Sequence, residues 1–505
     1  MRGGLTRASL KQASFFAEMG FKTQMLTFNF NPNYSMIRHQ LKKMNKVHKG
    51  VEIRNMYEEL AGHSLPPMNA APPVTASIED ITKGYAYDKR KDHNAYRIYK
   101  NGVYYKYVKI HELGSIDFID YYNENRYRTK RVTYDLWGNI KRIAYMDLLH
   151  NKPRQIIYYD ENGRAYFTQW NNPETNEVER IILFGTEATL TKQYVNDSTT
   201  LKVDWLTDII SNEDNKSIVV SDTRSTDQVL VDLNHSNAAK IWRLHSNHVK
   251  PPYQTDSEIA QFVEAGYNNM NKFDVAVFLT YEQKNDILNR TKQSKNNFKV
   301  IPHYHETHRG LFKSLFQRRK PDEKLAVIVS RLSTLKRIDH AVRAFESVTK
   351  EIPDARLEIW GKGTQLKSIK KLISKLGLKK NVFLKGYTHY PDDIYEKGLF
   401  SILTSKSEGF ALSVLESMYN KTPVISYNIK YGPTDMIVQN KNGFLVENGN
   451  IDALAEKMIW MFKNPKKSLT MGKRARKHID ENFSKKIYKD KWLESIDLAM
   501  KNKFD

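Results

Sequence analysis

Two glutamates eight residues apart lie in a segment whose composition could bind a phosphorylated ligand. Glu408 precedes Gly409, and Glu416 follows in the expected helix after an apolar strand pattern at 400–404. One carboxylate could face a reacting group while the other accepts hydrogen bonds from ligand hydroxyls, and N–H groups at the helix start could hold a phosphate. Gly409 would allow close approach to the backbone. A pair of glutamates alone is weak evidence for a binding site. It becomes informative here because the pair follows an expected strand.

Two cations follow another expected strand. Arg331 comes directly after the pattern at 325–330, and Lys336 lies five residues later at the start of the next helix. Both would lie at the carboxyl end of the sheet, where fixed cations could neutralise a diphosphate and stabilise it as it leaves. The alternative is two solvated charges in a chain that has 80 Lys and Arg residues.

Glycine turns end two further strands of the same region. Gly361 and Gly363 follow the pattern at 356–360, and Gly386-Tyr387 follows 382–384. Each turn singly is typical of an ordinary left-handed connection. Together with the two motifs above, they place four strand ends around one cleft.

Two histidines follow a strand in the first half of the chain. His245 and His248 come after the pattern at 240–244. Their spacing could suggest a metal site, but no matching Asp, Glu or His cluster follows, and a structural histidine is the commoner case. A third interpretation is that one histidine faces the cleft and orients a substrate hydroxyl.

The periodicity predicts two α/β blocks, because short apolar strands alternate with helical patterns as in a parallel sheet covered by helices. Two such blocks facing each other form a cleft at the carboxyl ends of their strands. A polar linker is expected at 302–324 and an amphipathic helix at 484–500. The expected strands are 21–30, 217–221, 240–244, 275–279 and 298–301 in the first block, and 325–330, 356–360, 382–384, 400–404 and 424–427 in the second.

A tyrosine-rich segment interrupts the first block. Of 29 tyrosines, 15 fall between Tyr85 and Tyr166, among turn dipeptides such as Asn101-Gly102 and Asn162-Gly163. Alternating segments between such turns predict successive β-hairpins. We interpret the tyrosines as cross-strand pairs of an antiparallel meander, with an oligomerisation or polymer-binding face as the alternative.

The chain opens on Gly3-Gly4 and a helical pattern that ends near Gly20. A glycine pair before a helix normally follows a strand in a βαβ unit, because the glycines form the tight turn. Almost nothing precedes the pair here. We expect that the first strand of the block is missing from this sequence, and the alternative is a flexible start.

Length and charge limit the classes of function. At ~150 residues per domain, 505 residues suggest about three domains. The net charge of +23 favours an anionic partner: nucleic acid, acidic lipid headgroups, a phosphate-rich polymer or a nucleotide. The absence of cysteine removes disulfides, thiolate zinc sites and cysteine nucleophiles. No apolar run approaches the ~18 residues that span a bilayer, and no signal peptide opens the chain, so we expect a soluble intracellular protein, at most peripheral to a membrane.

Several other motifs do not occur in the sequence. Asp392-Asp393 is not an Asp-X-Asp metal motif, and there is no Walker lysine loop, zinc pattern or serine elbow. The basic stretches at 42–43, 318–320 and 473–477 lack the aromatic interleaving of a single-strand binder, so we interpret them as solvated faces.

Together these residues resemble the retaining, nucleotide-sugar-dependent glycosyltransferases of family four. The resemblance covers the whole second block, above all at Glu408–Glu416, and the first block at Gly3-Gly4 and His245. The tyrosine-rich insertion and the loop 430–435 are similar to those of bacterial wall-teichoic-acid α-glycosyltransferases. Those enzymes put glucose or N-acetylglucosamine on poly(glycerol phosphate) or poly(ribitol phosphate), and a related transferase glycosylates serine-rich adhesins.

The resemblance implies an α/β protein with the GT-B fold: two Rossmann-like domains facing a cleft, with an antiparallel β-rich insertion in the first. We expect the N-terminal domain at 1–79 and 187–305, the insertion at 80–186, the nucleotide-sugar-binding domain at 306–485 and a C-terminal helix at 486–505.

The resemblance also implies residue roles. His245 contacts the donor sugar, Arg331 and Lys336 stabilise the leaving UDP, and Glu408 faces the transferred sugar. The residues implied in donor binding are Gly4, Gly386, Tyr387, Phe410, Ala411, Leu412, Ser413 and Glu416, with Glu416 on the ribose and Gly386-Tyr387 beside the uracil. No metal or other cofactor is expected. Retention in this fold is usually described as front-face attack, in which the leaving diphosphate helps to deprotonate the acceptor, and a glutamate nucleophile is the minority view.

The sequence departs from the family at two points. We expect the strand before Gly3 to be missing, and Ala411 occupies a position where many relatives have glycine. We expect activity to survive the alanine because the change is small.

Three functions remain open. The first is UDP-glucose- or UDP-N-acetylglucosamine-dependent glycosylation of a teichoic acid, by a cytoplasmic enzyme that self-associates through the insertion and lies at the inner face of the membrane. The second is O-glycosylation of a serine-rich adhesin. The third is a non-catalytic GT-B binding subunit, against which the four intact residues Arg331, Lys336, Glu408 and Glu416 argue. A nucleic-acid binder is a distant fourth. The choice of donor sugar rests on a few pocket contacts that the sequence does not identify.

Overall fold

The computed structural model describes residues 4–62, 71–90, 93–185, 189–291, 296–306 and 321–505. It divides into two compact units, Met1–Asn212 and Glu213–Asp505. Gly3 and most of the expected linker, 307–320, lie outside the described residues. Within the described ranges, no helix is long and apolar enough to cross a lipid bilayer.

The first unit begins with a small parallel sheet of β1 and β2, paired from Thr23–Val51 to Thr27–Asn55. The apolar residues of α1, α2 and both strands form one core that includes Leu10, Leu41 and Ile53. The helices are α1 (Gly4–Glu18), α2 (Tyr34–Lys43), α3 (Met56–Leu60), α4 (Ile78–Thr82) and α5 (Thr199–Ser211), and the two strands are β1 (Thr23–Thr27) and β2 (Val51–Asn55).

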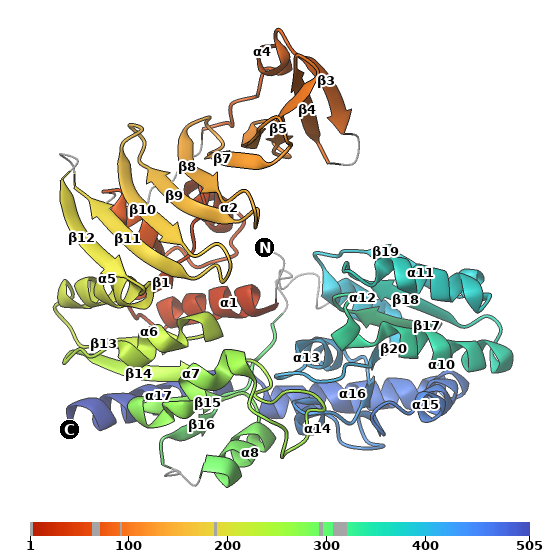
Figure 1. The fold of residues 1–505 in the computed structure, drawn as a ribbon. Helices are drawn as coiled ribbons and strands as arrows, with labels where there is room; N and C mark the ends of the chain where they lie inside the picture. Colours follow the sequence, from red (N-terminus) through yellow and green to blue (C-terminus); the bar gives the residue numbers. More distant parts are fainter. Residues whose placement is uncertain (1–3, 63–70, 91–92, 186–188, 292–295, 307–320) are drawn as a thin grey trace. The chain divides into compact units, whose positions relative to one another are not determined.

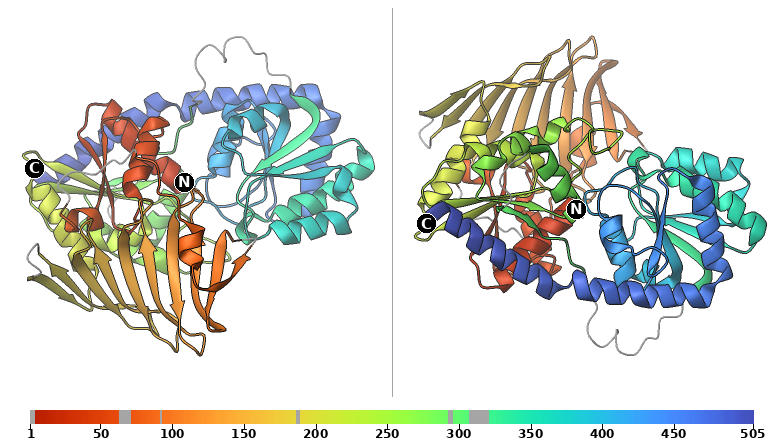
Figure 2. Two further views of the ribbon diagram at one scale, coloured as in Figure 1. Left: turned by 90° about the horizontal axis from the view of Figure 1, so that it is seen from above. Right: turned by 90° about the horizontal axis from the view of Figure 1, so that it is seen from below.

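A sheet of ten described strands forms the rest of the first unit, and its strands lie side by side in chain order (Figures 1 and 2). Every neighbouring pair is antiparallel. The strands are β3 (Ala86–Arg90), β4 (Ala95–Lys100), β5 (Val103–Ile110), β6 (Ile116–Tyr122), β7 (Arg128–Tyr134), β8 (Ile140–Met146), β9 (Pro153–Tyr159), β10 (Ala165–Asn171), β11 (Val178–Phe184) and β12 (Leu190–Val195). The structure therefore confirms the antiparallel meander.

Turn residues and aromatic pairs explain this sheet. Asn101 and Gly102 both have positive φ, 49° and 80°, as a two-residue hairpin between β4 and β5 requires. Tyrosines then pair across strands: the rings of Tyr104 and Tyr122 stack with centroids 4.6 Å apart. Such cross-strand pairs are the units that stabilise a sheet, so the tyrosine content follows from the architecture.

The second unit holds two parallel sheets. The first has the order β13-β14-β15-β16, and the second has the order β19-β18-β17-β20-β21-β22. The first sheet and its helices are β13 (Ser217–Ser221), α6 (Asp227–Asp232), β14 (Ala238–Arg243), α7 (Glu264–Asn268), β15 (Val275–Phe278), α8 (Tyr281–Thr291) and β16 (Phe298–Val300), with the 3₁₀ turns η1 (Arg224–Thr226), η2 (Gln261–Val263) and η3 (Met270–Lys272).

The six-stranded sheet is covered by helices whose apolar residues face it. In α10, Ile338, Val342 and Phe345 recur at helical spacing and are fully or nearly fully buried. The strands are β17 (Asp322–Val329), β18 (Arg356–Trp360), β19 (Val382–Gly386), β20 (Gly398–Leu403), β21 (Val424–Tyr427) and β22 (Gly443–Val446). The helices and 3₁₀ turns are η4 (Thr334–Lys336), α10 (Ile338–Glu351), α11 (Leu366–Lys375), η5 (Leu378–Lys380), α12 (Pro391–Lys397), α13 (Leu412–Tyr419), α14 (Pro433–Met436), α15 (Ile451–Lys463), α16 (Pro465–Asn482) and α17 (Lys485–Phe504).

The last two helices pack against different sheets of the second unit. Helix α16 contacts β20 and β22, whereas α17 contacts β13, β14 and β15 (Figure 2). Trp492 of α17 is fully buried, and the guanidinium of Arg243 lies 5.3 Å from its ring centroid. The C-terminal helix therefore completes the core of the four-stranded sheet.

Candidate active site

The strand order of the six-stranded sheet marks where a ligand would bind. The chain starts at β17, adds β18 and β19 on one side, and then continues with β20 on the other side of β17. Ligands of doubly wound folds bind at this reversal, outside the carboxyl ends of the two central strands. Here the loops that leave β17 and β20 carry Lys336 and Glu408.

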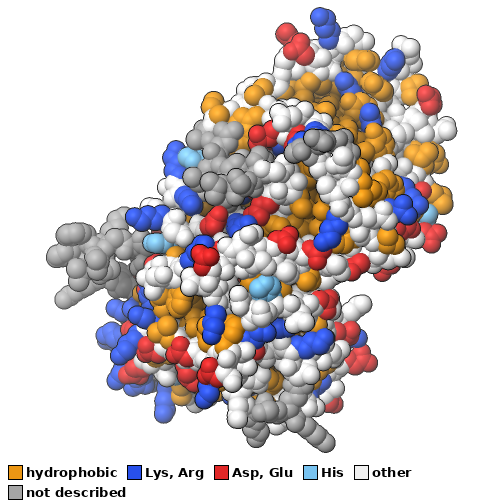
Figure 3. Space-filling model, turned by 90° about the vertical axis from the view of Figure 1, so that its left-hand side faces the viewer, with side chains coloured by type: hydrophobic (Ala, Val, Ile, Leu, Met, Phe, Trp, Pro, Cys, Tyr) orange, Lys and Arg blue, Asp and Glu red, His pale blue; other side chains and the backbone are white. Residues whose placement is uncertain are grey.

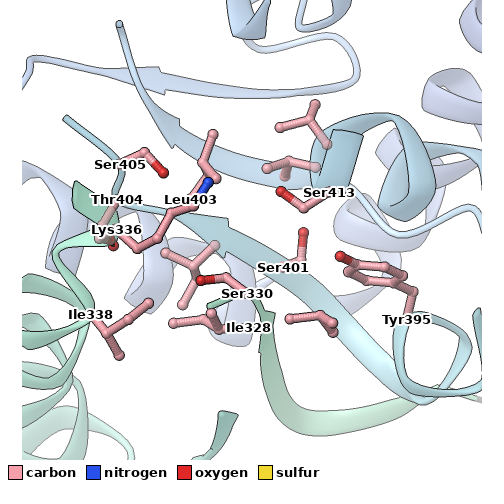
Figure 4. A pocket seen from close by; sticks show the side chains of 14 residues that line it. Ile328, Ser330, Lys336, Ile338, Tyr395, Ser401, Leu403, Thr404, Ser405 and Ser413 are labelled. Carbon is pink, nitrogen blue, oxygen red and sulfur yellow. The ribbon is translucent and has the colours of Figure 1, made fainter. Parts of the chain in front are cut away.

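The structure brings Lys336 and Glu408 into direct contact. The Lys336 ammonium pairs with Glu408 Oε1, which also accepts a hydrogen bond of 2.6 Å from Ser405 Oγ. The side chains of Lys336 and Glu408 are only 14% and 13% exposed. Figure 4 shows Lys336 and Ser405 beside each other, Lys336 in the 3₁₀ turn after β17 and Ser405 in the loop after β20. An ammonium has three donors, so Lys336 can keep Glu408 and still contact an anionic ligand.

Arg331 lies in the same loop as Lys336 but is exposed. Its side chain forms no ion pair or hydrogen bond with the described part of the chain. It is therefore a cation at the mouth of the site that no described side chain neutralises.

The cavity behind these loops is too small for a sugar. Its volume is about 10 Å³, and Ser330, Lys336, Ser401 and Ser413 are among its lining residues (Figure 4). Such a volume holds about one water molecule. A nucleotide-sized ligand would therefore lie outside it, over the strand ends.

His245 is held by a carboxylate that sequence reasoning missed. His245 Nε2 lies 2.7 Å from Asp222 Oδ1, and Asp222 directly follows β13. The fully buried guanidinium of Arg243 lies 3.9 Å from the same oxygen. An acidic residue directly after a buried strand, next to the strand that carries His245, is the signal that could have found Asp222.

This environment sets the protonation of His245. Burial and the nearby Arg243 cation lower the pKa of His245 although Asp222 opposes them. Burial tends to raise the pKa of Asp222, but His245 and Arg243 outweigh it, and its pKa lies below the ordinary value. We infer a neutral imidazole that donates Nε2–H to an ionised Asp222. Nδ1 is then left as a hydrogen-bond acceptor.

Gly409 lets the His245 loop and the Glu408 loop touch. A Cβ on Gly409 would lie 2.0 Å from the His245 carbonyl oxygen, so no larger residue fits. Next to this contact, Asn247 Nδ2 donates a 2.8 Å hydrogen bond to Ser407 Oγ. His245 and Glu408 are therefore on loops that contact each other, and Asn247 and Ser407 are contacts that the sequence did not reveal.

The glycine turns align three strand ends. A Cβ on Gly361 would lie 1.8 Å from Ser330 O, and one on Gly363 would lie 2.1 Å from Leu332 O. Gly361 N also donates to Gly386 O at 2.7 Å, and Gly386 has a φ of 79°. Tyr387 follows and is 42% exposed. These loops lie at the same sheet edge as Arg331, and Tyr387 offers an aromatic ring there.

The other residues implied in donor binding lie at the start of α13. Phe410 and Ala411 are buried, Leu412 and Ser413 open the helix, and Glu416 lies one turn further on. Ala411 caps the helix in the left-handed region, with a φ of 64°. Gly4 is the first residue of α1 and belongs to the other unit, so its implied role stays a prediction.

His248 is a packed histidine. Its ring stacks on Tyr267 and Tyr431, with centroids 6.2 and 5.8 Å away, and burial lowers its pKa to about 4. The described residues contain no group of three or more His, Asp or Glu side chains that could hold a metal ion.

Comparisons with known proteins agree with this geometry. Residues 313–478 match the family model described as glycosyl transferases group 1. The chain is 28% identical to poly(ribitol-phosphate) α-N-acetylglucosaminyltransferase of Staphylococcus aureus, over 97% of this chain and 96% of that protein. It is 28% identical to poly(glycerol-phosphate) α-glucosyltransferase of Bacillus subtilis, over 97% of this chain and 72% of that protein. A further relative, a UDP-N-acetylglucosamine–peptide N-acetylglucosaminyltransferase GtfA subunit of Limosilactobacillus reuteri, is 25% identical over 66% of this chain and 64% of that protein.

The fold also matches a solved structure along nearly its whole length. A crystal structure of a mutant of S. aureus TarM with fondaparinux, α-GlcNAc-glycerol and UDP has a TM-score of 0.80 and 26% identity, and covers 98% of this chain and 97% of that one. The chain therefore has the GT-B fold, carries a group 1 glycosyltransferase domain at 313–478, and is a hexosyltransferase.

Proposed function

We propose that the protein transfers glucose or N-acetylglucosamine, with retention, from a UDP-sugar to poly(glycerol phosphate) or poly(ribitol phosphate). The observation that carries the reaction is the Lys336–Glu408 pair at the strand reversal of the six-stranded sheet. Similarity to two polymer glycosyltransferases over nearly the whole chain supports the acceptor.

In this proposal, Lys336 and Arg331 bind the donor diphosphate. Charge builds up on the diphosphate as the sugar–phosphate bond breaks, and preorganised cations stabilise that charge better than water does. Glu408 fixes the Lys336 ammonium and faces the sugar, while Gly386, Tyr387 and Glu416 hold the nucleoside. The diphosphate takes the acceptor proton, so no protein base or metal is assigned.

His245 has a separate role in this scheme. Its Nδ1 accepts a hydrogen bond from a hydroxyl of the donor sugar, because Nε2 donates to Asp222. A neutral imidazole suits this role, since a protonated ring would add positive charge beside a sugar that becomes oxocarbenium-like.

UDP release tests the proposal. UDP-glucose and UDP-N-acetylglucosamine are each incubated with and without purified poly(glycerol phosphate) and poly(ribitol phosphate). We expect polymer-stimulated release with one donor, and a fall of about 100-fold or more in Lys336→Met and Glu408→Gln. Glu456→Gln, an exposed helix glutamate, is the matched control. Release that survives both site substitutions contradicts the assigned roles.

A protein acceptor is the second candidate, favoured by the similarity to the GtfA subunit. Transfer onto a serine-rich adhesin peptide, in the absence of polymer-stimulated release, would select it.

We also propose self-association through the ten-stranded sheet, in a cytoplasmic enzyme at the inner face of the membrane. Figure 3 shows hydrophobic side chains gathered over this sheet. The exposed tyrosines include Tyr87 and Tyr145 on its strands and Tyr127 in the turn before β7. Tyr87→Asp with Tyr127→Asp should lower the molar mass measured by light scattering, and an unchanged mass would exclude this face.

A further inference from the structure

A second basic hollow lies among β22, α15 and α16 and has no lining residue in common with the candidate active site. Its volume is about 500 Å³. The cations Lys457, Lys466, Lys467 and Arg474 surround it, together with the rings of Phe444 and Trp460. Arg474 belongs to the stretch 473–477, which the sequence suggested is a solvated face.

The four cations of this hollow have no acidic partner in the part of the chain that the structure describes. None of them forms an ion pair with a described residue, and no acidic side chain lines the hollow. Two basic residues near them are paired: Lys463 Nζ lies 2.7 Å from Glu351 and Arg476 Nε 2.8 Å from Asp480. The charge of these four cations is therefore not compensated within the hollow.

Two of the cations occupy an unfavourable position. Lys466 and Lys467 lie in the first turn of α16, which contains no acidic residue and whose cap forms no side-chain hydrogen bond. A helix N-terminus carries partial positive charge, so cations there destabilise the helix. Residues that lower the local stability of a fold are expected where ligand binding compensates for the cost. Here that ligand would be an anion.

The partly exposed indole of Trp460 suits a polyol, whereas Phe444 is buried behind it. Lys457 lies 5.4 Å from the ring centroid of Phe444, and Lys467 lies 6.0 Å from that of Trp460. The two rings meet edge to face with centroids 5.2 Å apart. Carbon atoms of a polyol can lie against an indole while the ammonium groups bind the phosphates on either side.

We propose that this hollow binds a phosphodiester-linked polyol segment of the acceptor polymer, remote from the site of transfer. The inference rests on the proposed function. A membrane is a less suitable partner, because protein surfaces that bind membranes insert protruding apolar side chains into the lipid. Over α15 and α16, none of the described large apolar side chains is exposed.

The test compares a triple variant, Lys466→Gln, Lys467→Gln and Arg474→Gln, with a control of equal charge, Lys379→Gln, Lys380→Gln and Lys397→Gln. The control lysines are exposed and lie outside the hollow. Binding of poly(glycerol phosphate) is measured directly without donor, and KM is measured for the long polymer and for a single glycerol-phosphate unit. We expect the triple variant to raise Kd and KM for the polymer about fivefold to tenfold, with less dependence on salt, and to leave the single unit unchanged. The control should behave like the wild type.

Other outcomes would overturn the inference. Wild-type transfer to the polymer shows that the proposed function holds, so an unchanged KM in the triple variant would then refute the hollow alone. Vesicles of phosphatidylglycerol form the second arm. Loss of vesicle binding in the triple variant with polymer binding intact would assign the hollow to lipid, and equal loss of both would mean unspecific attraction of phosphodiesters.

Discussion

At the scale of single residues, the candidate active site depends on side chains that orient other side chains. Asp222 fixes the tautomer of His245, and Ser405 orients Glu408 by a 2.6 Å hydrogen bond. Neither acts on a substrate in the scheme above. Such supporting contacts typically decide whether a ligating or reacting group has the right geometry.

Asp222→Asn tests the role of Asp222 as a positioning residue. The amide no longer holds His245 by charge, so the ring can rotate or change tautomer. We expect kcat to fall about tenfold to 100-fold while KM for the donor changes little. Steady-state kinetics measure this split. Asp214→Asn, an exposed change in the turn before β13, should leave kcat unaltered. An unaltered kcat in Asp222→Asn would refute the role.

The buried Asp435 carboxyl should make the free energy of unfolding depend on pH. Burial raises its pKa to about 6, and its Oδ2 has no hydrogen-bond partner among the described residues. The folded protein therefore binds this proton more tightly than the unfolded chain, whose aspartate has a pKa of about 3.9. Stability is lost as pH rises from about 4 to about 6.

We expect Asp435→Asn to raise the free energy of unfolding by about 1 kcal/mol at pH 7.5, because the amide carries no charge to bury. At pH 4 the gain should disappear. Urea unfolding at both pH values measures it, and Asp452→Asn on the exposed side of α15 serves as the control. A gain that does not depend on pH would contradict this explanation.

At the scale of elements, the spacing of apolar residues predicted those strands that depend on local sequence alone. The five strands expected in the second block all occur, because runs such as the fully buried β20 are apolar throughout. Strand β22 was not predicted, and its length does not explain this, because β21 is equally short and was predicted. Contacts between loops, such as Asn247 with Ser407, were also out of reach because they join positions 160 residues apart.

Ala411 allows a prediction about stability at the start of α13, which it caps. A left-handed backbone costs an L-residue roughly 1–2 kcal/mol, whereas glycine adopts it freely. Ala411→Gly also removes a buried methyl, so we expect a net gain of about 0.5 kcal/mol and unchanged transfer. Chemical denaturation measures the gain. The reverse sign is expected for Ala453→Gly in α15, where the helix favours alanine by about 1 kcal/mol. A loss of stability in both variants would show that Ala411 is unstrained.

At the scale of the whole molecule, the C-terminal helix supports residues far away in the sequence. Trp492 of α17 packs on Arg243, and Arg243 faces Asp222 in the His245 site. The sequence predicted the helix but not this chain of contacts, because an amphipathic pattern does not identify its partner sheet.

Trp492→Ala should lower the free energy of unfolding by about 3–5 kcal/mol, as expected for a fully buried aromatic residue. It should also lower kcat, because the Arg243 guanidinium loses the ring beneath it. Denaturation and kinetics at low temperature, where the variant stays folded, separate the two effects. Lys489→Ala on the exposed side of α17 should change either quantity little. A stable, fully active Trp492→Ala would disprove the connection.

The chain-order pairing of the ten-stranded sheet has an evolutionary consequence. Each strand bonds only to the strands before and after it in the chain, so a hairpin could be gained or lost without breaking any other pairing. Arrays that interact only with nearest neighbours tolerate such changes in length. Among homologous enzymes, we therefore expect this sheet to vary by pairs of strands, while the spacing between Lys336 and Glu408 stays nearly constant.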